Sequence, residues 1–138
     1  MLLIAGVSTV SIFSGCEKED EGKVISEQLS AVEWKIVSAV RITVNGNVDD
    51  PVNPCRLDNI FRYEDNGTFR IFTGTDLCTL GELGLVGTWE LVDDNTGIEI
   101  VIQGSSYTDH IVSVSSSELR LQADFGSYSI IETYNPIP

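Results

Sequence analysis

Residues 32–44 read VEWKIVSAVRITV, and hydrophobic side chains recur at every second position of this stretch. This parity holds Val32, Trp34, Ile36, Ser38, Val40, Ile42 and Val44. The positions between them are mostly polar, and alternation with a period of two is typical of a strand with one buried face. The stretch therefore predicts a long, half-buried β-strand at the start of the folded domain.

Shorter stretches with the same alternation follow along the rest of the chain, separated by turn residues. The further expected strands are residues 58–64, 68–73, 86–92, 98–102, 107–114, 119–123 and 127–134. Asn66-Gly67 marks a tight turn because both residues accept a positive φ at low cost. Pro136 ends the last strand, since proline cannot donate to the ladder. After residue 31 no stretch has a helical period, and no internal repeat indicates a second domain.

Eight successive antiparallel strands expose two edges unless the sheet closes on itself. The sequence therefore predicts an all-β fold over residues 31–138, an eight-stranded antiparallel up-and-down barrel, with a sandwich of two four-stranded sheets as the alternative. The long connections, residues 45–57 and 74–85, follow the first and third strands. Connections alternate between the two ends of such a barrel, so both are expected at the same end. A barrel of this size holds either core side chains or one small ligand.

The composition argues against one class of partner. The chain has 138 residues, which suits one domain, and its formal net charge is -13. Nucleic-acid binding needs clustered lysines and arginines that replace the counterions of the phosphate backbone. We therefore expect no nucleic acid as a partner.

The N-terminus indicates export. Residues 1–15 carry no charge and are too short to span a bilayer as a helix, but they fit the apolar region of a signal peptide. They lead into Phe13-Ser14-Gly15-Cys16, which resembles the lipobox of bacterial lipoproteins. In those proteins the cysteine is acylated, for example with palmitate, and becomes the mature N-terminus. The alternative is a buried N-terminal segment with an incidental cysteine.

A run of charged residues follows Cys16. Residues 17–23 read EKEDEGK, and such a run does not pack in a core, so residues 16–30 are predicted to be an acidic, solvated tether. The run also resembles the acidic segment that directs some Gram-negative lipoproteins to the cell surface. We therefore expect a lipid anchor in the outer membrane, with the domain facing the periplasm or the cell surface.

Two further cysteines lie in the long connections. With Cys16 acylated, Cys55 and Cys78 remain as a pair in an exported protein, so a disulfide between them is expected. The barrel topology brings both connections, and hence both cysteines, to the same rim. No second cysteine pair or nearby histidine completes a zinc site. We expect no metal and no cofactor.

The sequence lacks a catalytic constellation. His110 is the single histidine, and no nucleophile elbow accompanies it. It shares its parity with Val112 and Val114, which allows it to face the barrel interior in a structural role, and a surface position is the alternative. The acidic pairs 49–50, 64–65 and 93–94 lie in or beside turns, where such residues are ordinary. The chain is therefore not expected to be an enzyme.

Several motifs together resemble a known family. They are Ala31-Val32-Glu33-Trp34, Asn66-Gly67-Thr68-Phe69 and Gly87-Thr88-Trp89. Over about residues 26–134 the chain resembles the lipocalin-like domain of small Gram-negative lipoproteins. Cys55 and Cys78 match the cysteine positions of that family, whereas Val32 replaces the glycine of its first Gly-x-Trp. The resemblance implies fold and export and leaves the ligand open.

The candidate site follows from the strand pattern and the loops. Trp34, Phe61, Tyr63, Phe69 and Trp89 lie on the apolar parity of their strands, where they either fill the core or line a pocket. The expected rim consists of Asn47, Asp49, Asn53 and Arg56 on one loop and Thr75, Asp76 and Leu77 on the other. One hypothesis is a barrel that binds a small apolar ligand at its open end. The alternative is a structural or protein-interaction module with a filled barrel. An open interior above roughly 300 Å³ would favour the first.

Overall fold

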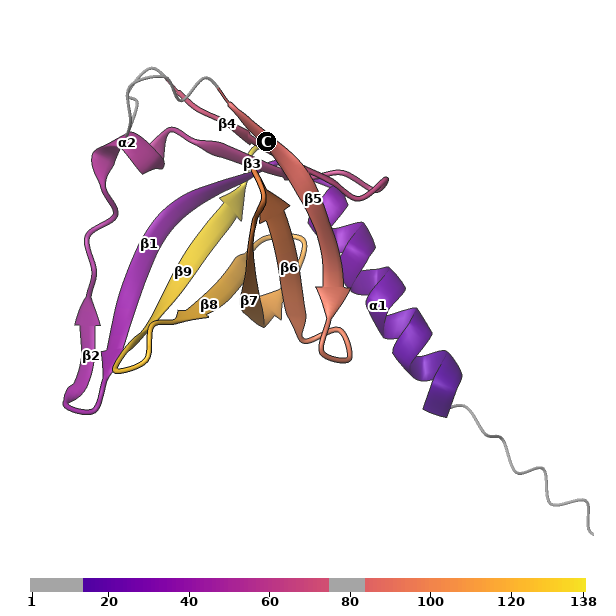
Figure 1. Cartoon of the computed structure of the whole chain (residues 1–138), viewed down its shortest axis with the longest axis horizontal. Coiled ribbons are helices and arrows are strands. Elements are labelled where there is room, and N and C mark those ends of the chain that lie inside the picture. The colour runs from indigo at the N-terminus through magenta and orange to yellow at the C-terminus, as the bar shows by residue number, and fades with distance from the viewer. Residues whose placement is uncertain (1–13, 75–83) are drawn as a thin grey trace, which may run out of the picture.

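The computed structural model describes residues 14–74 and 84–138 (Figure 1). Its elements are α1 (Ser14–Ser30), β1 (Trp34–Thr43), β2 (Gly46–Asp49), α2 (Pro54–Leu57), β3 (Ile60–Tyr63), β4 (Thr68–Phe72), β5 (Leu85–Val92), β6 (Gly97–Ile102), β7 (Ser105–Val114), β8 (Leu119–Asp124) and β9 (Ser129–Pro136). Each of the eight strands expected from the sequence is present. The order of elements already indicates a meander, since neighbouring strands along the chain are joined by short connections.

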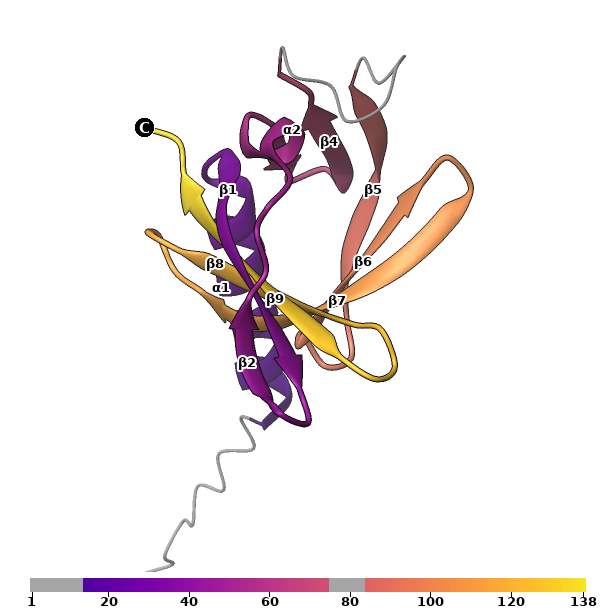
Figure 2. The same cartoon turned by 90° about the vertical axis from the view of Figure 1, so that its left-hand side faces the viewer.

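The sheet closes into a barrel. From β3 to β9 every strand pairs antiparallel with the next one in the chain, and β9 pairs back onto β1 from Trp34–Pro136 to Ile42–Ser129. Figure 2 shows the strands arranged around this ring. The prediction of an eight-stranded antiparallel up-and-down barrel is confirmed, and the sandwich alternative is wrong. Closure satisfies the backbone hydrogen bonds of the first and last strands, which would otherwise be open edges.

One connection holds more structure than the sequence predicted. The expected loop 45–57 contains β2, which forms a hairpin with the second half of β1, and the short helix α2, which packs against β1. Asn53 caps α2, because its Oδ1 accepts a hydrogen bond from the backbone N–H of Cys55 at 3.3 Å. Pro54 suits the first helical position, where a missing N–H costs nothing. Within β1 only Trp34 pairs with β3, opposite Phe61. Further along β1, the strand pairs with β2 instead.

The acidic segment is a helix. Residues 16–30, for which a solvated tether was predicted, lie within α1, and Leu29 near its end is fully buried. The indole Nε1 of Trp34 donates a hydrogen bond to the carbonyl of Leu29 at 3.0 Å. Glutamate and lysine are good helix formers, and Ile25 and Leu29, one turn apart, give the helix an apolar edge that packs on the core. The tether prediction is therefore wrong for the last turns of this segment.

The core is concentrated where α1 meets the barrel, which we call the α1 end. The turns 64–67 and 93–96 lie at this end, and the side chains of Trp34, Ile36, Ile98 and Leu119 are at most 1% exposed. Gly87, in the Gly-x-Trp motif, is needed on β5, because an added Cβ would lie 2.1 Å from the carbonyl oxygen of Val101 on the neighbouring strand β6. The opposite end, with α2 and the β8–β9 turn, is called the loop end.

The register of β1 is irregular in its middle. A bulge between Ile36 and Ser38 shifts the alternation, so that Ala39 is buried and Val44 is 96% exposed. The uniform apolar parity expected across residues 32–44 is therefore wrong beyond Ile36.

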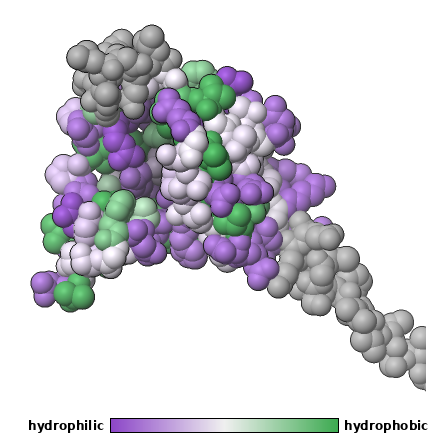
Figure 3. All heavy atoms as spheres, viewed as in Figure 1, coloured by the Kyte–Doolittle hydropathy of each residue, from purple (hydrophilic) through white to green (hydrophobic). Residues whose placement is uncertain are grey.

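The face visible in Figure 3 is mostly hydrophilic, with scattered hydrophobic patches. Among the residues that the structure describes, no helix is both long enough and apolar enough to cross a bilayer.

Candidate functional site: a cavity inside the barrel

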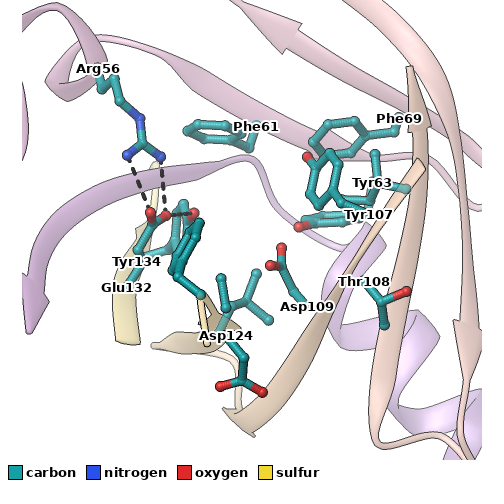
Figure 4. A pocket seen from close by; sticks show the side chains of 14 residues that line it. Arg56, Phe61, Tyr63, Phe69, Tyr107, Thr108, Asp109, Asp124, Glu132 and Tyr134 are labelled. Carbon is teal, nitrogen blue, oxygen red and sulfur yellow. Dashed lines mark hydrogen bonds and ion pairs between the residues drawn. The ribbon is translucent and has the colours of Figure 1, made fainter. Parts of the chain in front are cut away.

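A cavity of about 480 Å³ lies inside the barrel and reaches the loop end (Figure 4). Its lining includes Asp124 and the 54% exposed Phe125 at the β8–β9 turn, so the cavity opens to solvent there. None of the lining residues comes from α1. Six aromatic residues and four charged ones dominate the wall: Phe61, Tyr63, Phe69, Tyr107, Phe125 and Tyr134, with Arg56, Asp109, Asp124 and Glu132.

Aromatic rings from four strands form much of the wall. Phe61 of β3 meets Tyr134 of β9 edge to face, with ring centroids 5.4 Å apart. Tyr63 of β3 packs against Phe69 of β4 at 5.0 Å. Each of these residues points inward because it lies on the inner parity of its strand. Such contacts add specific geometry to the burial of apolar surface and hold the rings in place.

An ion pair spans the wall between α2 and β9. Arg56 donates two parallel hydrogen bonds to the carboxylate of Glu132, at 3.2 and 3.1 Å, and the Tyr134 hydroxyl also donates to this carboxylate. Burial alone would lower the pKa of Arg56, but the hydrogen bond and the charge of Glu132 raise it above its ordinary value. The guanidinium is therefore fully charged and neutralised within the protein. This pair links the connecting segment after β2 to the barrel wall.

Asp109 of β7 is a second carboxylate in the cavity. Figure 4 shows it directed into the space between Tyr63 and Tyr107 on one side and Glu132 and Tyr134 on the other. Among the described residues it has no hydrogen-bond or ion-pair partner. Burial, together with the negative charge of Glu132, raises the pKa of Asp109 to about 6, although the charge of Arg56 acts in the opposite direction.

The tyrosines around Asp109 are held neutral. Burial, with a smaller effect from the charge of Asp109, raises the pKa of Tyr107 to about 12. The pKa of Tyr63 is raised for the same two reasons, and burial also raises that of Tyr134, with Glu132 adding to the shift. These hydroxyls therefore remain hydrogen-bond donors and acceptors at physiological pH.

The structure places part of the predicted site together. Arg56, Phe61, Tyr63 and Phe69 line the cavity, whereas Trp34 and Trp89 do not. Both indoles lie in the core at the α1 end, and that of Trp89 donates to the carbonyl of Glu64 at 2.8 Å. The expectation that the two tryptophans line the same pocket as Phe61, Tyr63 and Phe69 is therefore wrong, because they fill the α1 end of the barrel and donate to backbone carbonyls.

Only part of the predicted rim lines the cavity. Asn47 and Asp49 are exposed on β2 and do not line the cavity, and Asn53 caps α2. Thr75, Asp76 and Leu77 lie outside the described residues, and so does Cys78.

Cys55 is buried on α2, and its pairing with Cys78 stays a prediction, as does acylation of Cys16. Within the described residues, no group of three or more histidine, cysteine or acidic side chains could hold a metal ion.

Sequence reasoning missed Tyr107, Asp109, Glu132 and Tyr134. A bulge between Ile111 and Ser113 reverses the parity of β7, so residues 107 and 109 face the cavity. His110 is exposed, so its surface alternative is confirmed and the inward position, inferred from Val112 and Val114, is wrong. The sequence did contain a signal for the inward face, because Tyr107 and Asp109 share their parity with Ile111, which is partly buried. Val114, on which the prediction relied, lies beyond the bulge and therefore indicated the wrong parity.

Comparison with known proteins supports the fold. No protein-family model and no curated protein matches the chain. A crystal structure of a lipocalin-like protein from Bacteroides uniformis matches with a TM-score of 0.51 and 14% sequence identity, covering 80% of this chain and 99% of that one. At this identity the likeness concerns architecture alone, and it agrees with the closed strand order. The chain therefore has a lipocalin-like β-barrel.

Proposed function

We propose that this chain is a binding protein whose barrel takes one small, mostly apolar ligand through its loop end. The observation that carries the proposal is the cavity of about 480 Å³ within the barrel. Pockets for small molecules start at roughly 300 Å³ and combine an apolar wall with a few polar groups that orient the ligand. The aromatic wall and the charged residues Arg56, Asp109 and Glu132 match this description.

The alternative of a filled barrel fits only half of the molecule. Trp34 and Trp89 close the α1 end, as a structural module would require, but among residues 14–74 and 84–138 no equally large apolar side chains fill the loop end. A module that used only its outer surface would gain stability from a packed interior at both ends. The hollow half therefore favours a ligand.

Native mass spectrometry of the protein from its own host tests this proposal. We expect a co-purified small molecule, and the neutral fluorophore N-phenyl-1-naphthylamine should bind to protein freed of it. Ala123→Trp adds an indole to the cavity wall and should weaken binding of the fluorophore more than tenfold. Val112→Trp, at an exposed position of β7, is the matched control and should bind as the parent does. Equal binding by both variants, or none by the parent, would favour the interaction module.

We also propose that the protein is exported and anchored in the outer membrane through acylated Cys16. The support is the apolar stretch 1–15 with its lipobox-like end, and α1 would then connect the anchor to the barrel at the end opposite the cavity mouth. Cys16→Ser should move the protein from the membrane fraction to the soluble fraction, because acyl chains supply the membrane affinity. Ser14→Ala, which keeps the cysteine, should stay with the membrane. Retention of Cys16→Ser after a high-salt wash would contradict the anchor.

The disulfide belongs to the same proposal of export. Joining Cys55 to Cys78 would tie α2, and with it Arg56, to the segment between β4 and β5. Peptide mapping without reductant should recover the two cysteines in one linked pair of peptides. Two free thiols in protein from the exported compartment would refute the pairing.

A further inference from the structure

The proposed function leaves the chemical class of the ligand open. The charged residues of the cavity favour one class over the others. Building on that function, we propose that the cavity selects a small organic cation: an ammonium group on an apolar body, with Asp109 as its counter-ion.

The position of Asp109 carries this inference. Its carboxylate lies among aromatic side chains inside the cavity, and among the described residues no donor reaches it (Figure 4). Asp109 is partly buried, and a carboxylate with reduced access to water lacks part of the solvation that would stabilise its charge. An ammonium group placed there would gain an ion pair with Asp109, and the faces of Tyr63 and Tyr107 would attract the same charge.

The charge balance of the cavity favours a cation over an anion. Arg56 is the single basic residue in the part of the lining that the structure describes, and Glu132 already neutralises it with two hydrogen bonds. An anionic ligand would have to displace Glu132 and would then lie near three carboxylates. Among the described lining residues Asp109 has no basic partner, so the interior of the cavity has a surplus of negative charge, to which the exposed Asp124 adds at the mouth. A cation offsets this surplus without breaking any contact.

The rest of the cavity sets the size and polarity of the ligand. Ile100, Leu121 and Ala123 provide an aliphatic wall next to the aromatic rings. A cavity of about 480 Å³ has room for roughly 16 groups the size of a water molecule, at about 30 Å³ each. A bicyclic aromatic amine of about a dozen heavy atoms therefore fits, with its ring against the wall and its nitrogen at Asp109.

Three indole probes of nearly equal size separate charge from apolar contact. Tryptamine carries an ammonium group, tryptophol a neutral hydroxyl and indole-3-acetate a carboxylate on the same ring. Calorimetry at pH 7.5 should show tryptamine binding at least tenfold more tightly than tryptophol, with indole-3-acetate weakest. In Asp109→Asn the preference for tryptamine over tryptophol should fall below about threefold. Asp65→Asn, at an exposed turn of the α1 end, is the matched control and should keep the full preference.

The pH dependence gives a second readout. Tryptamine stays cationic between pH 5 and 7.5, so its affinity should rise over this range as Asp109 loses its proton, while that of tryptophol stays flat. Asp109 is faced by Tyr63 from β3, Tyr107 from its own strand, Glu132 and Tyr134 from β9 and Arg56 from α2. The tyrosines and the arginine do not titrate in this range. Asp109→Asn distinguishes Asp109 from Glu132, because the rise should disappear in that variant.

The outcomes separate this inference from the proposed function. If N-phenyl-1-naphthylamine binds but tryptamine shows no advantage, the cavity is a binding site and the assignment of a cation is wrong. A rise with pH that persists in Asp109→Asn also overturns the role of Asp109. If neither the fluorophore nor any indole binds, the proposed function fails together with the inference.

Discussion

The two ends of the barrel are built from the same strands but differ in what they enclose. At the α1 end, Trp34, Ile98 and Leu119 are fully buried, and the indole of Trp34 is satisfied by a backbone carbonyl of α1. Toward the loop end the inward positions hold tyrosines and charged residues around a cavity. Both ends obey the alternation of a strand, so alternation decides which residues point inward. The size and charge of those residues decide whether the interior is a core or a site.

This difference implies that stability and binding are assigned to different ends. A filled layer contributes through close packing, whereas a carboxylate such as Asp109 in a cavity opposes folding and is typical of functional sites. Variants at the α1 end should therefore lower stability, and a variant at Asp109 should raise it.

The largest effect is expected at the α1 end. Trp34→Ala should lower the free energy of unfolding by about 3–5 kcal/mol, because it leaves a cavity in a close-packed layer and orphans the carbonyl of Leu29. Urea unfolding followed by circular dichroism measures this change. Phe125→Ala, at the exposed mouth of the cavity, is the control and should cost less than about 1 kcal/mol. Similar losses for both variants would show that the two ends do not differ in packing.

The second effect has the opposite sign. The pKa of Asp109 is raised from 3.8 to about 6, so the folded state binds its proton more tightly than the unfolded state does. Stability is therefore lost as the pH rises from about 4 to about 6, and Asp109→Asn should gain on the order of 2 kcal/mol above pH 6. The gain should vanish near pH 4, where the parent carboxyl is already neutral. A destabilised Asp109→Asn at pH 7.5 would contradict the assignment of Asp109 to the cavity.

The smallest effect concerns the ion pair across the cavity wall. A double-mutant cycle with Arg56→Met and Glu132→Gln should give a coupling energy of about 1 kcal/mol, since both side chains are partly screened by solvent. The more exposed pair Arg62–Glu33, whose side chains are 44% and 39% exposed, is the matched comparison and should couple by less than about 0.5 kcal/mol. Equal coupling in the two cycles would mean that the cavity wall gives Arg56 and Glu132 no advantage.

The strands could be predicted because a strand with one buried face has a local alternation of apolar and polar residues. The helix α1 could not, because its burial depends on an apolar edge near its end that includes Ile25 and Leu29, within a segment otherwise rich in charge. β2 was missed for a related reason: all four of its residues are exposed, so it has no buried face to produce a pattern. Pairing with β1 forms this strand, and pairing is not visible in composition.

The site was predicted less completely than the fold. Phe61, Tyr63 and Phe69 are large, apolar and in phase, so sequence alone indicates an inward position. Trp34 and Trp89 have the same signal, and only the three-dimensional packing shows that they belong to the core. The contact between Arg56 and Glu132 joins residues 76 positions apart, and no local rule relates them.

The pairing of β1 with β9 has a consequence for the speed of folding. Trp34 lies opposite Pro136, so the contact that completes the ring joins residues roughly 100 positions apart. Closing a loop of that length has a large entropic cost, which arises before the stabilising contacts form. Proteins with such high contact order fold in milliseconds to seconds rather than microseconds. The ring also cannot close until the final strand has been synthesised, so every shorter nascent chain exposes two unpaired strand edges. Those edges are the surfaces that a chaperone would have to shield.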